Sequence, residues 1–367
     1  MNNKILALAV STALTLGVSG QASASIYAGS SLSIENLNVF VANAAPDEGT
    51  PVAPAVDLEN DFFFTAGATA TLNGASAPGV DSITCTGQTD CAHAAGDPVL
   101  QMIKNAPGGD VTRTDATTFL GPVHGDQTYA NSAAEITSAT LVDAVPTSTN
   151  QIAEVEIAGS GHGVSESSIK STTTFSFTFE VADGGVFALN FDADPNMFVT
   201  LDTPGVLPPI EATTRMSASA TLTGGNGVNV AWSADGEFAT TNDLDFNGNN
   251  ISQAEADYNN LFSSTNCSGG VACIETADAY NLNQTVTLPP NLNPAYNGYE
   301  DSRFGVDNGF GSFGFAVSNL DAGAYTLVLS ATTFAEAQQN VPEPNSLALL
   351  GLGLAGMGFA KRKRNVN

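Results

Sequence analysis

The 367-residue chain is strongly acidic, with 37 Asp and Glu residues against 10 Lys and Arg and a formal net charge of −27 at pH 7. Of these acids, 36 lie in residues 25–341 against five basic residues, so this part carries a net charge of −31. A surface with that charge repels phosphate groups, which excludes nucleic acid as a partner. Hydrophobic residues make up 43% of the chain, which excludes wholesale disorder and supplies a core for one large β-rich domain or two smaller ones.

Residues 1–24 have the pattern of a secretory signal peptide. Lys4 gives a positive start, residues 5–18 form an apolar stretch, and Ala22-Ser23-Ala24 is a small-residue cleavage site before Ser25. The apolar stretch is too short to span a bilayer, which argues against a permanent anchor. The sequence therefore predicts export, with Ala22 and Ala24 marking the cleavage site.

The body, residues 25–340, is dominated by runs in which apolar and polar residues alternate, as in a half-buried β-strand. Residues 175–181 alternate in this way, Asp183-Gly184-Gly185 follows as a turn, and residues 187–191 alternate again, which predicts a β-hairpin. Residues 311–317 and 324–331, joined by residues 319–323, predict a second hairpin near the end of the body. Further strands are expected at residues 31–41, 68–72, 217–223, 228–232 and 284–288.

Helical patterns are scarce in the body. A capping box at Ser252–Glu255 predicts a short helix over residues 253–262, and residues 331–339 are either helical or an extended stalk. Many short strands with few short helices indicate an all-β fold, an antiparallel β-sandwich or a jelly-roll-like body. The proline-rich residues 202–211 are the candidate internal boundary.

The four cysteines form two pairs with the same spacing, Cys85 with Cys91 and Cys267 with Cys273. In an exported chain this spacing predicts two local disulfides, each closing a loop of seven residues. Other pairings, such as Cys85 with Cys273, stay open at this point. A metal site formed by Cys85, Cys91 and His93 is the alternative.

An acid- and amide-rich segment precedes the predicted helix and resembles a calcium loop of the EF-hand or dockerin kind. The candidate ligands are Asp243, Asp245, Asn247, Asn249 and Glu255. Depending on where the loop starts, it is one residue short or its closing acid comes one residue late. An Asn-rich turn that leads into a capped helix is the alternative.

The C-terminal segment, residues 341–367, has three features in a fixed order. Pro342-Glu343-Pro344 is extended, because each proline fixes its own φ and biases the residue before it away from helix. Residues 346–360 are then almost entirely apolar or small, and the basic residues 361–364 follow. The pattern predicts a short C-terminal transmembrane helix with its basic end in the cytoplasm and the acidic body on the other side.

This order of features resembles the PEP-CTERM tail of bacterial exosortase substrates. The resemblance covers about the last 27 residues and the signal peptide that accompanies such tails. It implies that an exosortase recognises Pro342, Glu343 and Pro344 and processes the chain. It also implies transient anchoring in the inner membrane, followed by placement at the cell surface or outside the cell.

The sequence contains no GxSxG elbow and no HExxH motif, so we expect no enzymatic activity. Exosortase systems accompany exopolysaccharide and biofilm production, so the resemblance implies a non-enzymatic surface or extracellular-matrix protein with extracellular polysaccharide as a partner. A calcium-dependent carbohydrate-binding or adhesive module is the alternative, with Trp232, Tyr296 and Tyr299 as its candidate aromatic residues. A glycosidase that uses two acids is a third interpretation.

Overall fold

The structure is a computed structural model whose described part consists of strands, turns and short irregular segments. The described residues are 25–43, 62–79, 81–86, 98–104, 118–120, 128–138, 147–158, 161–177, 185–202, 210–224, 227–234, 267–279, 281–288, 299–300 and 310–339. Within these ranges no helix has the length and apolar character needed to cross a membrane. The predicted helix at 253–262 and the C-terminal helix lie outside them.

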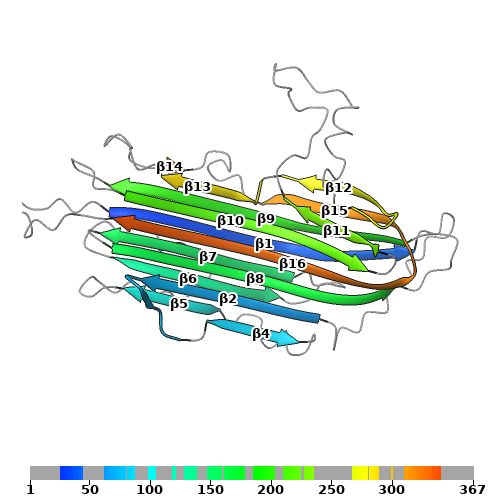
Figure 1. Cartoon of the computed structure of the whole chain (residues 1–367), viewed down its shortest axis with the longest axis horizontal. Coiled ribbons are helices and arrows are strands. Elements are labelled where there is room, and N and C mark those ends of the chain that lie inside the picture. Colours follow the sequence, from blue (N-terminus) through cyan, green and yellow to red (C-terminus); the bar gives the residue numbers. More distant parts are fainter. Residues whose placement is uncertain are drawn as a thin grey trace, which may run out of the picture.

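The strands form two eight-stranded sheets, A and B, which Figure 1 shows lying over one another. Sheet A has the order β12 (Ala272–Asp278), β15 (Gly311–Leu320), β9 (Gly185–Asp202), β1 (Ser25–Asn43), β7 (Thr147–Ala158), β6 (Tyr129–Ser138) and β5 (Val99–Lys104), with β14 (Tyr299–Glu300) beside β9. Sheet B has the order β11 (Asn229–Ser233), β10 (Ile210–Gly224), β16 (Gly323–Gln339), β8 (Gly161–Phe177), β2 (Phe62–Leu72) and β3 (Ala75–Ser76), with β13 (Gln284–Leu288) beside β10 and β4 (Ser82–Thr86) beside β2.

Every strand pair within the described ranges is antiparallel. This confirms the prediction of an all-β antiparallel fold. One apolar core joins the inner faces of the two sheets, because alternate residues of the strands point inward. From sheet A these include Ile26, Leu32 and Phe187, and from sheet B Ala335 and Leu327.

The long central strand β1 keeps its apolar residues on the core face by means of a bulge. Its register shifts between Glu35 and Asn38 against β9, and Asn36 has a positive φ of 56°. Because the bulge adds one residue, the core-facing positions are even-numbered before it and odd-numbered after it. As a result Ile34 before the bulge and Leu37 after it both face the core.

Both predicted hairpins are wrong, although their strands are present. β8 pairs with β16 and β2 in sheet B, whereas β9 pairs with β1, β14 and β15 in sheet A. The second predicted hairpin fails in the same way, because β15 belongs to sheet A and β16 to sheet B. Two strands that each bury one face have the same alternation whether they are neighbours in one sheet or lie in opposite sheets of a sandwich, so the pattern alone does not identify a hairpin.

Residues 331–339, expected to be helical or a stalk, are the second half of β16. They pair with residues 210–218 of β10 on one side and with residues 161–169 of β8 on the other. Alternation places Ala331, Ala335 and Ala337 in the core. Residues 203–209, in the candidate boundary between β9 and β10, lie outside the described ranges.

Candidate functional site

Most residues singled out by the sequence lie outside the described ranges. They are Ala22 and Ala24 of the signal peptide, Pro342, Glu343 and Pro344 of the sorting motif, the candidate calcium ligands Asp243, Asp245, Asn247, Asn249 and Glu255, and Cys91, His93 and Tyr296. Tyr299 lies in β14, which pairs with β9. The predictions for the terminal segments and for calcium therefore stay predictions.

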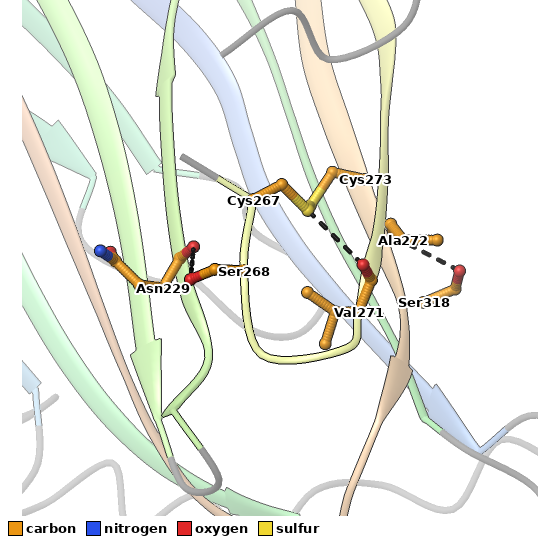
Figure 2. Close-up of a disulfide and its surroundings, with 7 residues drawn as sticks. All are labelled: Asn229, Cys267, Ser268, Val271, Ala272, Cys273 and Ser318. Atoms are coloured by element: carbon orange, nitrogen blue, oxygen red, sulfur yellow. Dashed lines mark hydrogen bonds between the residues drawn. A yellow bond between two sulfur atoms is a disulfide. The ribbon is translucent and has the colours of Figure 1, made fainter. Parts of the chain in front are cut away.

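The predicted disulfide between Cys267 and Cys273 is present, with the two Cα atoms 6.3 Å apart. Figure 2 shows its loop between β11 and β15. Ser268 exchanges two backbone hydrogen bonds with Asn229 of β11, with N···O distances of 3.0 and 3.4 Å. The other end of the loop continues into β12, the edge strand of sheet A. The cross-linked loop therefore joins the edges of the two sheets.

Cys85, in β4, is also disulfide-bonded and is 2% exposed. Its predicted partner Cys91 lies outside the described ranges. A sulfur in a disulfide is not a thiolate ligand, so Cys85 does not take part in the alternative metal site.

Trp232, a candidate sugar-binding aromatic, is 4% exposed and belongs to the core. Its ring stacks on Phe315 at a centroid distance of 5.4 Å and meets the ring of Phe191 edge-on at 5.9 Å. Its indole nitrogen donates a 2.5 Å hydrogen bond to Oε1 of Glu275 in β12. Trp232 thus connects β11 of sheet B to β12 of sheet A and presents no face to a sugar.

A small apolar cavity of about 40 Å³ lies beside this aromatic group. Its walls include Ile34, Leu37 and Phe191 from sheet A and Trp232 and Ala331 from sheet B. A cavity of this size has room for little more than a few water molecules. It is not a site for a sugar or a cofactor, which need hundreds of Å³.

A buried carboxyl group accepts hydrogen bonds from three separate elements of the fold. Glu154 of β7 is fully buried on the outer face of sheet A. It accepts hydrogen bonds from the Tyr27 hydroxyl at 3.0 Å, from Asn131 Nδ2 at 2.7 Å, and from the Leu120 amide, which is 3.1 Å from each carboxyl oxygen. These contacts hold residues 118–120, the covering segment, against the sheet.

The strand register explains this arrangement. Glu154 lies between Gly29 of β1 and Asn131 of β6. Because Gly29 has no side chain, the Tyr27 ring crosses it to reach Glu154; a Cβ at position 29 would lie 2.6 Å from the Tyr27 hydroxyl oxygen. Phe119 of the covering segment packs edge-on against Phe198 of β9 at 5.3 Å.

Glu154 and Glu156 were missed at the sequence level. Residues 152–157 alternate between apolar and acidic, which predicts that the acids face solvent. In the structure the covering segment, which is distant in sequence, lies over this face of the sheet. Both are 0% exposed. Since the Glu154 carboxyl is occupied by donors from three elements, the arrangement is suited to holding the covering segment in place.

His162 lies in strand β8. Its Nε2 is 2.8 Å from Oε1 of Glu336 in β16, and both side chains are about two-fifths exposed, at 44% and 42%. In the part of the chain that the structure describes, no group of three His, Cys, Asp or Glu residues is placed to hold a metal ion. The acidic residues 192–196 are part of strand β9.

Comparisons with known proteins assign the tail and leave the body without a family. Residues 340–364 match the family described as PEP-CTERM protein-sorting motif. No curated protein matches the chain. Solved structures give a faint likeness to the major capsid protein P2 of bacteriophage PM2, at 9% identity and a TM-score of 0.11, covering 81% of this chain and 97% of that one. A structure of infectious bursal disease virus strain Gt gives 9% identity and a TM-score of 0.10, covering 87% and 76%. TM-scores this low carry no argument about the body.

The tail match fits the order of features seen in the sequence. The match includes Pro342-Glu343-Pro344, the apolar stretch at 346–360 and the basic residues 361–364. Such a signal implies export, transient anchoring in the membrane, and an exosortase as the processing partner. The chain therefore carries a PEP-CTERM sorting motif and is an exosortase-targeted exported protein with an all-β body in two antiparallel sheets.

Proposed function

We propose that this protein is a non-enzymatic component of the cell surface or extracellular matrix, associated with exopolysaccharide or biofilm. The observation that carries the proposal is the sorting motif at residues 340–364 attached to an acidic two-sheet body. The geometry of the body supports it. The small inter-sheet cavity is apolar, and Glu154 is occupied by structural hydrogen bonds.

The net charge of the body restricts which polymers can bind to it. A body with 36 acids in residues 25–341 repels anionic chains at low ionic strength. A neutral exopolysaccharide, or an anionic one bridged by divalent cations, is therefore the polymer class that this surface accommodates. The calcium-dependent adhesive alternative loses one of its candidate aromatics, because Trp232 is buried.

Delivery is tested by replacing Pro342, Glu343 and Pro344 together with Ala and fractionating the cells. We expect the wild type outside the cell or at its surface and the variant retained in the inner membrane. Replacing Pro289 and Pro290 of the body with Ala is the matched control and leaves delivery unchanged. Equal distribution of the wild type and the tail variant would contradict the assigned route.

The non-enzymatic matrix role is tested with purified protein and exopolysaccharide from the producing strain. We expect the protein to co-sediment with the polymer without changing the polymer's size distribution. Shortening of the polymer would identify a hydrolase, and the absence of co-sedimentation with and without calcium would remove the polysaccharide association.

Thermal unfolding tests calcium binding at Asp243, Asp245, Asn247, Asn249 and Glu255. Millimolar-range sites are typical outside the cell, and a bound cation relieves repulsion among the acids. We expect calcium to raise the melting temperature by several degrees and replacement of Asp245 with Asn to abolish the increase. An unchanged melting temperature in calcium and in chelator would remove calcium from the proposal.

A further inference from the structure

Exposed apolar side chains gather in one row on the outer face of sheet A. Among the described residues, three large apolar side chains are exposed: Phe40 (50%), Ile274 (52%) and Phe310 (45%). Two of them lie in the same row. Phe40 of β1 is paired with Ala188 of β9, Ala188 with Ala316 of β15, and Ala316 with Ile274 of β12. Directly paired residues lie on the same face of a sheet, so these four side chains form a continuous row across four strands.

This row, Phe40, Ala188, Ala316 and Ile274, is called the apolar row below. It lies at the end of the sheet where β15 pairs with the start of β9 and β12 forms the edge, at the right in Figure 1. The core faces of the same strands are filled by Val39, Leu189, Phe315 and Glu275. The apolar row therefore does not contribute to the core, and it faces solvent.

The described residues next to the apolar row are uncharged. The described neighbouring outward positions along the four strands are Asn38, Asn190, Gly314, Thr276, Val186, Ser318 and Ala272. None of them is acidic, although acids outnumber bases by 36 to five in residues 25–341. On a body this acidic, two copies repel each other over most of their surface. This neutral face is where that repulsion is weakest at close approach.

The shape of the row is suited to contact with an identical row. Bulky Phe40 and Ile274 lie at the two ends of the row, and small Ala188 and Ala316 lie between them, at the inter-strand spacing of about 4.8 Å. A twofold axis between β9 and β15 places each Phe40 over the Ile274 of the other copy and each Ala188 over the Ala316 of the other copy, so that all four residues lie in the contact. A foreign partner would need its own matching neutral surface, whereas a second copy supplies one by symmetry.

We propose that the apolar row is a self-association surface through which two copies of this protein meet, outer face of sheet A against outer face of sheet A. Four strands and three outward positions on each span roughly 14 Å by 14 Å, or about 200 Å² per copy. Stable dimers bury about 800 Å² per partner. The association is therefore weak and concentration-dependent, and it strengthens as salt screens the repulsion between the acidic bodies.

The test is sedimentation velocity over a range of protein and salt concentrations, on the protein in the form that its host accumulates. We expect the wild type to dimerise reversibly and more strongly at high salt. Phe40→Ser and Ile274→Ser should each weaken dimerisation by about tenfold or more. Phe310→Ser is the matched control, because Phe310 is similarly exposed but precedes Gly311, which pairs with Ala193, away from the apolar row; this variant should dimerise as the wild type does.

A second variant tests whether misfolding, rather than loss of the contact, explains a weaker dimerisation. Ala188→Glu leaves Phe40 and Ile274 in place and puts two like charges near each other across the twofold axis. It should abolish dimerisation at low salt while the circular dichroism spectrum stays that of the wild type. A wild type that is monomeric under all conditions would overturn the proposal, as would dimerisation that Phe40→Ser and Ala188→Glu leave unchanged or that Phe310→Ser weakens equally.

Discussion

The two ends of one surface, the outer face of sheet A, have opposite distributions of polar and apolar groups. At one end, acids are inside: Glu154 and Glu156 are 0% exposed, and the covering segment lies over Glu154. At the other end, apolar groups are outside, with Phe40 and Ile274 about half exposed. Burial of an acid is compatible with folding only when hydrogen bonds replace water, whereas exposure of an apolar side chain costs folding little. The comparison teaches that the covered end contributes to stability and that the open end is available for contacts between molecules.

The largest effect is expected at the covered end, from Glu154→Ala. The substitution leaves the Tyr27 hydroxyl, Asn131 Nδ2 and the Leu120 amide without their common acceptor. We expect the free energy of unfolding, measured in urea, to fall by about 3 kcal/mol. Glu166→Gln, at an exposed position of β8, is the control and should leave it unchanged. A loss no larger than that of the control would mean that the carboxyl does not hold the covering segment.

The next effect concerns the edge strand that carries the open end. Cys267 and Cys273 close a loop that is also bonded to β11 through Ser268. For a loop of this length, chain entropy gives a contribution of about 2 kcal/mol. Thermal unfolding of the double variant Cys267→Ser, Cys273→Ser should show that loss, with earlier hydrogen exchange at the backbone amides of β12. If β12 exchanges as in the wild type, the loop is not what anchors this edge.

A smaller loss is expected from Gly29→Ala at the covered end. The new Cβ would lie 2.6 Å from the Tyr27 hydroxyl oxygen and 3.0 Å from a Phe119 ring carbon. Tyr27 must shift away from Glu154, at an expected cost of about 1–2 kcal/mol. A double-mutant cycle with Tyr27→Phe separates the causes, because the cost falls when the hydroxyl is already absent. An equal cost in both backgrounds would place the strain in the backbone.

Local alternation was enough to predict the antiparallel all-β class and many of the strands, but not β5, β6, β7 and β12, and not which strands are neighbours. Phe175 and Phe177 before the turn at 183–185 and Phe187 and Leu189 after it show the same pattern, yet the strands lie in opposite sheets. The pairing is decided by long-range contacts such as Phe187 with Phe315, whose ring centroids are 5.8 Å apart. The disulfide at Cys267 was predictable because its spacing is local. Glu154 was not, because its burial depends on Leu120 and Tyr27, which are 34 and 127 residues away in the chain.

The smallest effect on stability is expected at the open end. A small effect there would show that Phe40 is not needed for folding. Phe40→Ser removes a side chain that is 50% exposed and absent from the core. We expect the free energy of unfolding of the monomer, measured in dilute protein, to change by no more than about 0.5 kcal/mol. A side chain that contributes this little to folding is available for a contact outside the molecule, which is the role that we propose for Phe40. A loss above about 2 kcal/mol would instead assign Phe40 to the fold, and the distinction between a stabilising covered end and an open end for association would then fail.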